Sequence, residues 1–404
     1  MNVRQALAPA ARLGYLDGLR AVAVLLVVVF HARVHLPGVR LEEFFKECSH
    51  GVDLFFVLSG FCLARPTLEK LARAGSAPFD LAGYAAKRVL RILPPYAAAV
   101  GAFAALGGFL MSHNLPLPPG MQPFGAADVA SELLFMDQGL QHINASFWSL
   151  AVEFRWYFLF PLMLALWVRS QRSFLALLVL VIVASELTRA TSTDVGVMPA
   201  FLLGIVAAGL ALREHPVVRY APLLCLACII FALLNEQRYH FPIQTNVGWH
   251  LASFFFVLYA GYREWLRRLL SSRALVTVGT ASYSIYLVHE PIVGAVVSAL
   301  GARIGGPPAM IVAAAAGVGG GFAFWSVVER PLTAPSFVAE YLRRIRPSFG
   351  RLLEIADVPE TFALHDTHVD RAGASQESSP VVVELHSVRE LETNDSRRHA
   401  IRRA

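Results

Sequence analysis

The sequence predicts an all-α protein, a polytopic integral membrane bundle of about ten transmembrane helices followed by a disordered C-terminal tail. Hydrophobic residues make up 56% of the 404-residue chain and charged residues 16%, whereas soluble domains average roughly 45–50% and about 25%. The mean hydropathy is +0.53, and apolar runs near the roughly 20 residues that cross a bilayer recur along the chain. These observations exclude a soluble globular enzyme, a collagen, a disordered protein and a disulfide scaffold, and they make the lipid bilayer the first expected partner.

Ten apolar stretches, each bounded by charged residues or by Gly and Pro, are the predicted spans. The stretches 51–64 and 173–187 are short for a hydrocarbon core of about 30 Å, so we expect them to extend into polar flanks, to lie obliquely or to thin the membrane. The sequence fixes the count to within one span. The predicted spans cover residues 19–36, 51–64, 93–112, 148–168, 173–187, 198–213, 219–235, 248–263, 282–301 and 309–328.

Loop charges predict the orientation, because cytoplasmic loops hold the excess of Lys and Arg. With the N-terminus in the cytosol, the inner loops carry 14 Lys and Arg residues and the outer loops carry 6. The sequence therefore predicts a multi-pass protein with both termini in the cytosol. The same asymmetry explains the net charge of +6, and we expect no nucleic-acid partner.

The chain divides into three predicted segments: a cytosolic N-terminal segment at 1–13, a membrane domain at 14–334 and a cytosolic tail at 335–404. Ser, Glu, Asp and Arg dominate the tail, and its apolar runs are too short to span a membrane, which predicts disorder. The first apolar run could be a signal peptide, but charged residues stand at its start and no clean cleavage site follows. No internal repeat is found, which disfavours a transporter built from duplicated halves.

Ionisable side chains inside apolar spans cost a few kcal/mol each, so each is a candidate functional residue. In the first span, Arg20 and His31 are 11 residues apart, which places them within roughly 20° of one helix face. Asp17 precedes Arg20 by three residues and could hold its guanidinium group. Histidine is the side-chain type whose ordinary pKa lies near neutrality, as a general base requires, so His31 is the candidate base. The alternative is that Arg20 reaches the headgroups and His31 only satisfies a carbonyl.

The fourth span opens with Trp148 and Ser149 and carries Glu153 one turn after Ser149, on the same face. A carboxylate in a span must be paired or protonated, and either state suits a proton relay or the orientation of a substrate hydroxyl. The alternative is a structural ion pair with Arg155 or Arg20.

Three further features have mainly structural interpretations. His289 and Glu290 in the ninth span are expected to be polar groups inside the bundle, more often structural than catalytic. Cys225 and Cys228 have the spacing of half a zinc site but lie in an apolar helix without a second pair, so we expect packing and no bound metal. The apolar glycine-rich stretch 317–321 suits close helix packing rather than a nucleotide phosphate.

Six motifs follow one another along the chain. They are Tyr15-Leu-Asp-Gly-Leu-Arg20 with His31 eleven residues on, Gly51-Val-Asp-Leu-Phe-Phe-Val-Leu-Ser-Gly-Phe61, Arg88-Val-Leu-Arg91-Ile-Leu-Pro-Pro-Tyr96, Trp148-Ser-Leu-Ala-Val-Glu153, Ser282-Tyr-Ser-Ile-Tyr-Leu-Val-His289 and Glu329-Arg-Pro331. In this order they resemble the acyltransferase family 3 of membrane-bound O-acyltransferases. The resemblance covers about residues 14–334, so the predicted membrane domain is a membrane acyltransferase domain.

The resemblance implies transfer of an acyl group, commonly acetyl from cytosolic acetyl-CoA, to a hydroxyl of a carbohydrate such as a cell-surface or secreted polysaccharide. It implies that Arg20 and His31 form the family's Arg/Lys-x10-His pair and that Glu153 is its acid. Arg88 and Arg91 match the family's cytosolic Arg-x-x-Arg and are expected to bind the phosphates of acyl-CoA, the co-substrate. Ordinary positive-inside charge is the alternative explanation of that pair.

We therefore predict an O-acetyltransferase of the bacterial cytoplasmic membrane. His31 is the predicted base, and Arg20, held by Asp17, steadies negative charge on the thioester oxygen. Glu153 orients His31 or the acceptor. The residues assigned to substrate binding are Trp148, Ser149 and His289.

Some members of the family carry an additional extracytoplasmic SGNH-type domain at the C-terminus. The final segment here is short and lacks a Gly-Asp-Ser nucleophile motif, so we expect transfer to finish within the membrane domain. The rival interpretations are an acyltransferase with an antibiotic or lipid acceptor and a proton-coupled transporter or flippase. The acceptor, the oligomeric state and the role of Arg155 cannot be read from the sequence.

Overall fold

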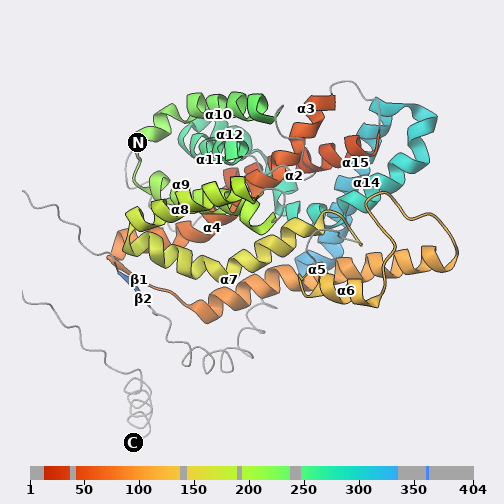
Figure 1. Ribbon diagram of the computed structural model, residues 1–404, viewed down its shortest axis with the longest axis horizontal. Coiled ribbons are helices and arrows are strands. Elements are labelled where there is room, and N and C mark those ends of the chain that lie inside the picture. Colours follow the sequence, from red (N-terminus) through yellow and green to blue (C-terminus); the bar gives the residue numbers. More distant parts are fainter. Residues whose placement is uncertain are drawn as a thin grey trace, which may run out of the picture. The chain divides into compact units, whose positions relative to one another are not determined.

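The computed structural model describes residues 13–36, 42–136, 143–188, 193–236, 247–334 and 361–363. Within these residues the chain is a bundle of helices (Figure 1), so the predicted fold class is confirmed. The predicted cytosolic N-terminal segment lies outside the described residues except for residue 13. The predicted disordered tail also lies outside them except for 361–363.

In the described part of the chain, a long helix coincides with each of the ten predicted spans. These helices are α2 (Gly14–Val34), α4 (Gly51–Ala74), α5 (Leu81–Ser112), α7 (Phe147–Arg169), α8 (Gln171–Leu187), α9 (Thr193–Leu212), α10 (Ala221–Glu236), α11 (Val247–Tyr262), α14 (Ser282–Ile304) and α15 (Gly306–Phe324). Shorter pieces join or extend them: α3 (Glu42–Glu47), the 3₁₀ turns η1 (Cys48–His50) and η2 (Pro216–Tyr220), α6 (Ala126–Leu133), α12 (Glu264–Leu270), α13 (Arg273–Thr280), the π-helical turn η3 (Trp325–Glu329) and α16 (Arg330–Leu332).

Eight helical segments in the described residues are long and apolar enough to cross a membrane. The helices α8 and α11, with 17 and 16 residues, are shorter, so the count of about ten is approximate. The predicted span 51–64 extends into its polar flank, because α4 runs for 24 residues and its last turns carry charged side chains. That extension is one of the three expected solutions to a short apolar run.

The start of α5 corrects the sequence analysis. The helix begins directly after Asp80 rather than near residue 93, so Lys87, Arg88 and Arg91 lie on a helix and not in a loop. Asp80 caps the helix by accepting a hydrogen bond from the Gly83 N–H at 2.8 Å. A search for apolar runs misses this polar first third of α5, because it follows hydropathy and not capping.

Two consecutive prolines, Pro94 and Pro95, lie inside α5 without ending it. Membrane helices tolerate proline where neighbouring groups satisfy the backbone atoms that lose their partners. The carbonyls that these prolines leave without a helical donor are those of Leu90 and Arg91; at the next residue, the Tyr283 hydroxyl of α14 donates to the Ile92 carbonyl at 2.8 Å. The contact joins the middle of α5 to the start of α14.

Small residues allow the helices to approach closely. Where α4 meets α9, a Cβ atom on Gly204 would lie 2.7 Å from the Phe61 nitrogen and 2.9 Å from the Gly60 Cα. In the glycine-rich stretch of α15, a Cβ on Gly317 would lie 3.4 Å from the His289 Cβ of α14. The stretch 317–321 therefore packs against a helix, as predicted.

A short strand pair departs from the all-helical expectation. Strand β1 (Ser76–Pro78), between α4 and α5, pairs antiparallel with β2 (Thr361–Ala363), with Ala77 opposite Phe362. The three residues 361–363 of the predicted tail are thus ordered beside the α4–α5 connection, because the strand pair supplies backbone hydrogen bonds that the tail's composition does not reveal.

Candidate active site

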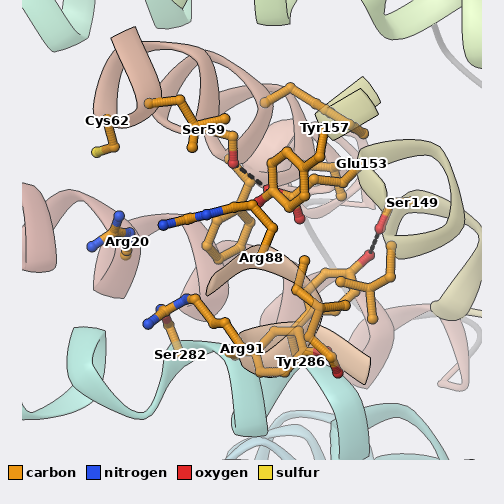
Figure 2. Close-up of a pocket in the computed structure, with 17 residues that line it drawn as sticks. Arg20, Ser59, Cys62, Arg88, Arg91, Ser149, Glu153, Tyr157, Ser282 and Tyr286 are labelled. Atoms are coloured by element: carbon orange, nitrogen blue, oxygen red, sulfur yellow. Dashed lines mark hydrogen bonds between the residues drawn. The ribbon is translucent and has the colours of Figure 1, made fainter. Parts of the chain in front are cut away.

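A pocket opens between α2, α4, α5, α7 and α14, which are far apart in the sequence (Figure 2). It holds about 800 Å³ of space not filled by protein atoms, part of it open to the outside. Its lining consists of Arg20, Val52, Phe55, Phe56, Ser59, Cys62, Leu63, Arg88, Arg91, Ile92, Ser149, Leu150, Glu153, Tyr157, Ser282, Tyr283 and Tyr286. Five predicted site residues meet here: Arg20, Arg88, Arg91, Ser149 and Glu153.

Three guanidinium groups give this pocket its positive charge. Figure 2 shows Arg20, Arg88 and Arg91 directed toward the same side of the pocket. Arg88 and Arg91 are three residues apart on α5 and therefore share a helix face. The Arg88 guanidinium lies over the rings of Tyr84 and Tyr157, at 6.0 and 5.9 Å. Within the described residues neither Arg88 nor Arg91 forms a close ion pair with a carboxylate. The buried Glu329 carboxylate interacts electrostatically with Arg91 at longer range, so Arg88 is the less compensated of the two charges.

The first turn of α2 holds Arg20 in the pocket. Its Nη1 lies 3.1 Å from Asp17 Oδ1, which is the contact expected from the spacing. Asp17 is buried. The turn packs tightly on its neighbours, because a Cβ on Gly279 would overlap the Asp17 backbone and a Cβ on Gly18 would overlap the Leu270 backbone. Arg20 is thus anchored to a rigid part of the bundle.

Glu153 accepts two hydrogen bonds from hydroxyl groups at the pocket wall. Ser59 Oγ of α4 and Tyr157 OH both donate to Oε1, the latter at 2.6 Å. The carboxylate forms no ion pair within the described chain, so the alternative of a structural pair with Arg155 or Arg20 is not what the structure contains. Its charge is balanced by hydrogen bonds rather than by a salt bridge.

Arg155, which the sequence analysis cannot place, has a structural position away from the pocket. Its Nε and Nη2 atoms each lie 2.8 Å from an oxygen of Asp194 in α9, and its Nη1 donates to the Phe135 carbonyl at 2.5 Å. This fork-like pair joins α7 to α9 and to the turn after α6.

His31 and His289 meet outside the pocket lining. His289 Nε2 lies 3.1 Å from His31 Nδ1. On its other side, His31 Nε2 lies 3.6 Å from Glu290 Oε1, and Ser146 Oγ donates to Glu290 Oε2 at 2.6 Å. We call His31, His289, Glu290 and Ser146 the histidine cluster. The carboxylate that faces His31 is therefore Glu290, and not Glu153.

The pocket and the histidine cluster are joined through α7 and α14. Ser149 and Tyr286 line the pocket, and their hydroxyl oxygens are 2.5 Å apart. The Tyr286 hydroxyl also donates to the Ser146 carbonyl at 3.1 Å. Figure 2 shows Ser149 and Tyr286 on the side of the pocket away from the guanidinium groups. The neutral side of the pocket thus adjoins the cluster that holds His31.

Two predicted features lie elsewhere. Trp148 is partly buried, packs against the hydrophobic core and does not line the pocket. Cys225 and Cys228 are free thiols, and Cys225 Sγ lies 3.4 Å from the Ala252 carbonyl oxygen. Among the described residues no group of three or more potential metal ligands is found.

Four residues that the structure brings to the site have no functional role predicted from the sequence: Ser59, Tyr157, Tyr286 and Glu290. For Tyr157 the signal is present, since it follows Glu153 by one helical turn. Glu290 is a carboxylate in an apolar span, the same anomaly that singles out Glu153. Only the contact between α2 and α14 distinguishes its position from that of a structural group.

Comparisons with known proteins agree with the motifs. Residues 13–326 match a family described as "Acyltransferase domain", Acyl_transf_3. The "O-acetyltransferase OatA" of Staphylococcus aureus strain NCTC 8325 is 24% identical over 318 residues, which cover 69% of this chain and 50% of the relative. A "Putative O-acetyltransferase SACOL0978" of Staphylococcus aureus strain COL is 24% identical over 316 residues, with the same coverages. The chain spans about half the length of these curated relatives, and no solved structure matches it. Because the family match covers most of the chain and contains five of the six motifs, this protein belongs to acyltransferase family 3.

Proposed function

We propose that this protein is a membrane-embedded O-acyltransferase that moves an acyl group, acetyl in the first instance, from acyl-CoA to a hydroxyl of a carbohydrate. The observation that carries the proposal is the convergence of Arg20, Arg88 and Arg91 in one pocket, where neither Arg88 nor Arg91 has a carboxylate within ion-pair distance in the described chain. The names of the relatives support O-acetyl transfer.

The positive side of the pocket suits the phosphates of acyl-CoA. Guanidinium groups bind phosphate through two parallel charge-assisted hydrogen bonds, and two of them lie one turn apart on α5. We infer that the phosphates bind Arg88 and Arg91 and that the thioester extends toward Ser149 and Tyr286. The acyl group then approaches the histidine cluster, which adjoins that side of the pocket.

In the proposed reaction the acceptor hydroxyl oxygen bonds to the thioester carbonyl carbon, and the carbon–sulfur bond breaks. His31 takes the hydroxyl proton as the new bond forms and gives it to the departing coenzyme A thiolate. Arg20 lies with Arg88 and Arg91 on the side of the pocket away from Ser149 and Tyr286, about 16 Å along α2 from His31, so we assign it to the donor phosphates rather than to the thioester oxygen expected from the sequence. Glu153 orients the reacting groups through Ser59 and Tyr157.

The donor assignment is tested with the full chain in lipid nanodiscs, by measuring coenzyme A release at varied acetyl-CoA. Losing a hydrogen bond to a charged group costs about 1.5–3 kcal/mol, so Arg88→Ala and Arg91→Ala should each raise KM for acetyl-CoA on the order of 10-fold or more. Arg268→Ala is the matched control, since Arg268 is exposed and pairs only with Glu264 in the described structure. An unchanged KM in both pocket variants would overturn the donor site.

The acceptor is identified by mass analysis of cell-surface glycans and small metabolites from cells with and without the intact gene. A carbohydrate that loses acyl groups in the deletion supports the proposal. Acyl groups lost from a lipid or antibiotic would replace the carbohydrate with that acceptor. A molecule that changes sides of the membrane without being acylated would support a transporter instead.

A further inference from the structure

The hydrogen bonds of His289 determine which of its ring nitrogens carries a proton. Its Nδ1 lies 2.8 Å from the Tyr286 carbonyl oxygen and 3.2 Å from the Ile285 carbonyl oxygen. Carbonyl oxygens only accept hydrogen bonds, so Nδ1 must be the donor. In the neutral ring His289 Nε2 is then an acceptor, and this atom faces His31.

The same reasoning assigns the tautomer of His31. Its Nδ1 lies 3.1 Å from His289 Nε2 and 3.0 Å from the Val27 carbonyl oxygen. Both neighbours are acceptors, so His31 Nδ1 carries the proton and His31 Nε2 presents its lone pair. Nε2 is therefore the basic atom of His31, on the side of the ring away from His289.

Glu290 faces that basic atom. The 3.6 Å between His31 Nε2 and Glu290 Oε1 is long for a hydrogen bond but within reach of an ion pair once Nε2 is protonated. The Glu290 side chain is fixed by Ser146 Oγ at 2.6 Å. Gly120 lies against it, since a Cβ there would be 2.9 Å from Glu290 Cγ.

His31 is more exposed to solvent than Glu290 and His289, the two residues that contact it. The His31 side chain is 15% exposed and that of Glu290 is 4% exposed, while His289 is fully buried. A third histidine, His35, lies in the turn after α2 and interacts electrostatically with the cluster. Burial lowers the pKa of His35, which disfavours a further positive charge beside His31.

From these contacts we propose that His289 and Glu290 are positioning residues for His31. His289 holds the His31 proton on Nδ1, and Glu290 stabilises the imidazolium that forms when Nε2 takes a proton. The proposal rests on the proposed function in one respect, namely that His31 is the base of acyl transfer. It replaces the structural role expected for Glu290 and the substrate-binding role predicted for His289.

The kinetic test compares pH–rate profiles of the full chain in nanodiscs. Glu290→Gln removes the carboxylate charge that favours protonated His31, so the acidic limb of the profile should move to lower pH and kcat should fall on the order of 10-fold or more. The charged and titratable groups that the structure records facing His31 are Glu290 and His289 from α14 and His35 from the turn after α2. KM for acetyl-CoA should stay within about two-fold, because the phosphate-binding arginines are not in this cluster.

Position 289 offers a conservative variant. His289→Gln can place an amide oxygen where Nε2 accepts from His31, whereas His289→Leu cannot. Gln should retain activity within a few-fold of the parent, and Leu should lose on the order of 10-fold or more. Glu264→Gln and His113→Leu are the matched controls, since both residues are exposed and outside the site. The inference would be overturned if Glu290→Gln and His289→Leu both had the pH–rate profile of the parent. If His31→Ala were inactive in the same experiment, the proposed function would still stand.

A spectroscopic measurement tests the tautomer without any turnover. The chain has 13 histidines, and the ¹⁵N signals of His31 are identified by their loss in His31→Gln. At a pH where the ring is neutral, Nε2 should have the shift of an unprotonated nitrogen and Nδ1 that of a protonated one. The opposite assignment would overturn the inference even in an active enzyme. The predicted shifts in a protein without transferase activity would instead indicate that only the proposed function fails.

Discussion

Among single residues, Glu153 has an unusual balance of charge and hydrogen bonding. It lies in a pocket with three arginines, yet its described hydrogen bonds come from two hydroxyl groups and not from a guanidinium group. Both hydroxyls donate to the same oxygen, Oε1. The second oxygen is therefore the one available to a bound substrate or to a proton.

Glu153→Gln tests whether this charge is needed. An amide oxygen at the Oε1 position can still accept from Ser59 and Tyr157, so the helices should assemble as before while the charge is lost. We expect kcat to fall on the order of 10²-fold, the scale of a lost general acid or base. The readout is acylated product per monodisperse protein in detergent. If Glu153→Gln were fully active and only Glu153→Ala lost activity, Glu153 would have a structural role.

Among the helices, α2 has the largest share of the site. It carries Arg20 beside the start of α14, where Ser282 and Tyr283 line the pocket, and His31 beside His289 further along α14. Arg20 thus lines the pocket and His31 contacts α14, and the 11-residue spacing predicts that the two side chains share one helix face. The catalytic arrangement therefore depends on the rotational register of one helix against another.

Inserting one alanine between Leu25 and Leu26 tests this dependence. The insertion rotates His31 by about 100° relative to Arg20 and shifts it by about 1.5 Å, so transfer should be abolished although both residues remain. Leu26→Ala is the control, because it changes the same partly exposed position without changing the register. We expect that variant to stay within a few-fold of the parent. Parental turnover by the insertion variant would contradict the shared-face mechanism.

Helix packing at glycine gives a second prediction for these elements. Gly204→Ala forces a Cβ against the backbone of α4 near Phe61, and overpacking of this kind costs about 1–3 kcal/mol. We expect a lower thermal midpoint in detergent and a weaker site, since α4 carries Ser59. Gly319→Ala is the matched control because a Cβ there meets no atom within 4 Å. Equal midpoints for the two variants would show that the α4–α9 contact adapts without cost.

For the whole molecule, the strand pair constrains the topology. Because β1 and β2 are hydrogen-bonded, we expect residues 76–78 and 361–363 to lie on one side of the membrane, with an even number of crossings between them. Eight long helices lie between them in the described chain, α5 to α15. The parity agrees with the loop-charge argument for two termini on one side. The Lys and Arg residues in the last turns of α4 and the first turns of α5 flank β1, so we expect them on the same side of the membrane as the strand pair.

Cysteine labelling in intact cells tests this topology. In a background without the four native cysteines, Asn114→Cys after α5 should react with a membrane-impermeant maleimide from outside. Ala74→Cys before β1 and Thr361→Cys in β2 should react only after the cells are permeabilised. Labelling of Ala74→Cys in intact cells would reverse the orientation. Opposite behaviour of Ala74→Cys and Thr361→Cys would contradict the strand pair.

Composition and local spacing were sufficient to predict the membrane bundle, the apolar part of each long helix and the six motifs, because lipid imposes a long apolar run on every span. The 11-residue spacing also predicts that Arg20 and His31 share a face. Tertiary structure alone decided their partners. Glu290 and Glu153 are equally anomalous carboxylates in sequence, but helix packing brings Glu290 to His31 and leaves Glu153 with Ser59. Contacts between residues more than 90 positions apart depend on which helices pack together, and hydropathy does not encode that choice.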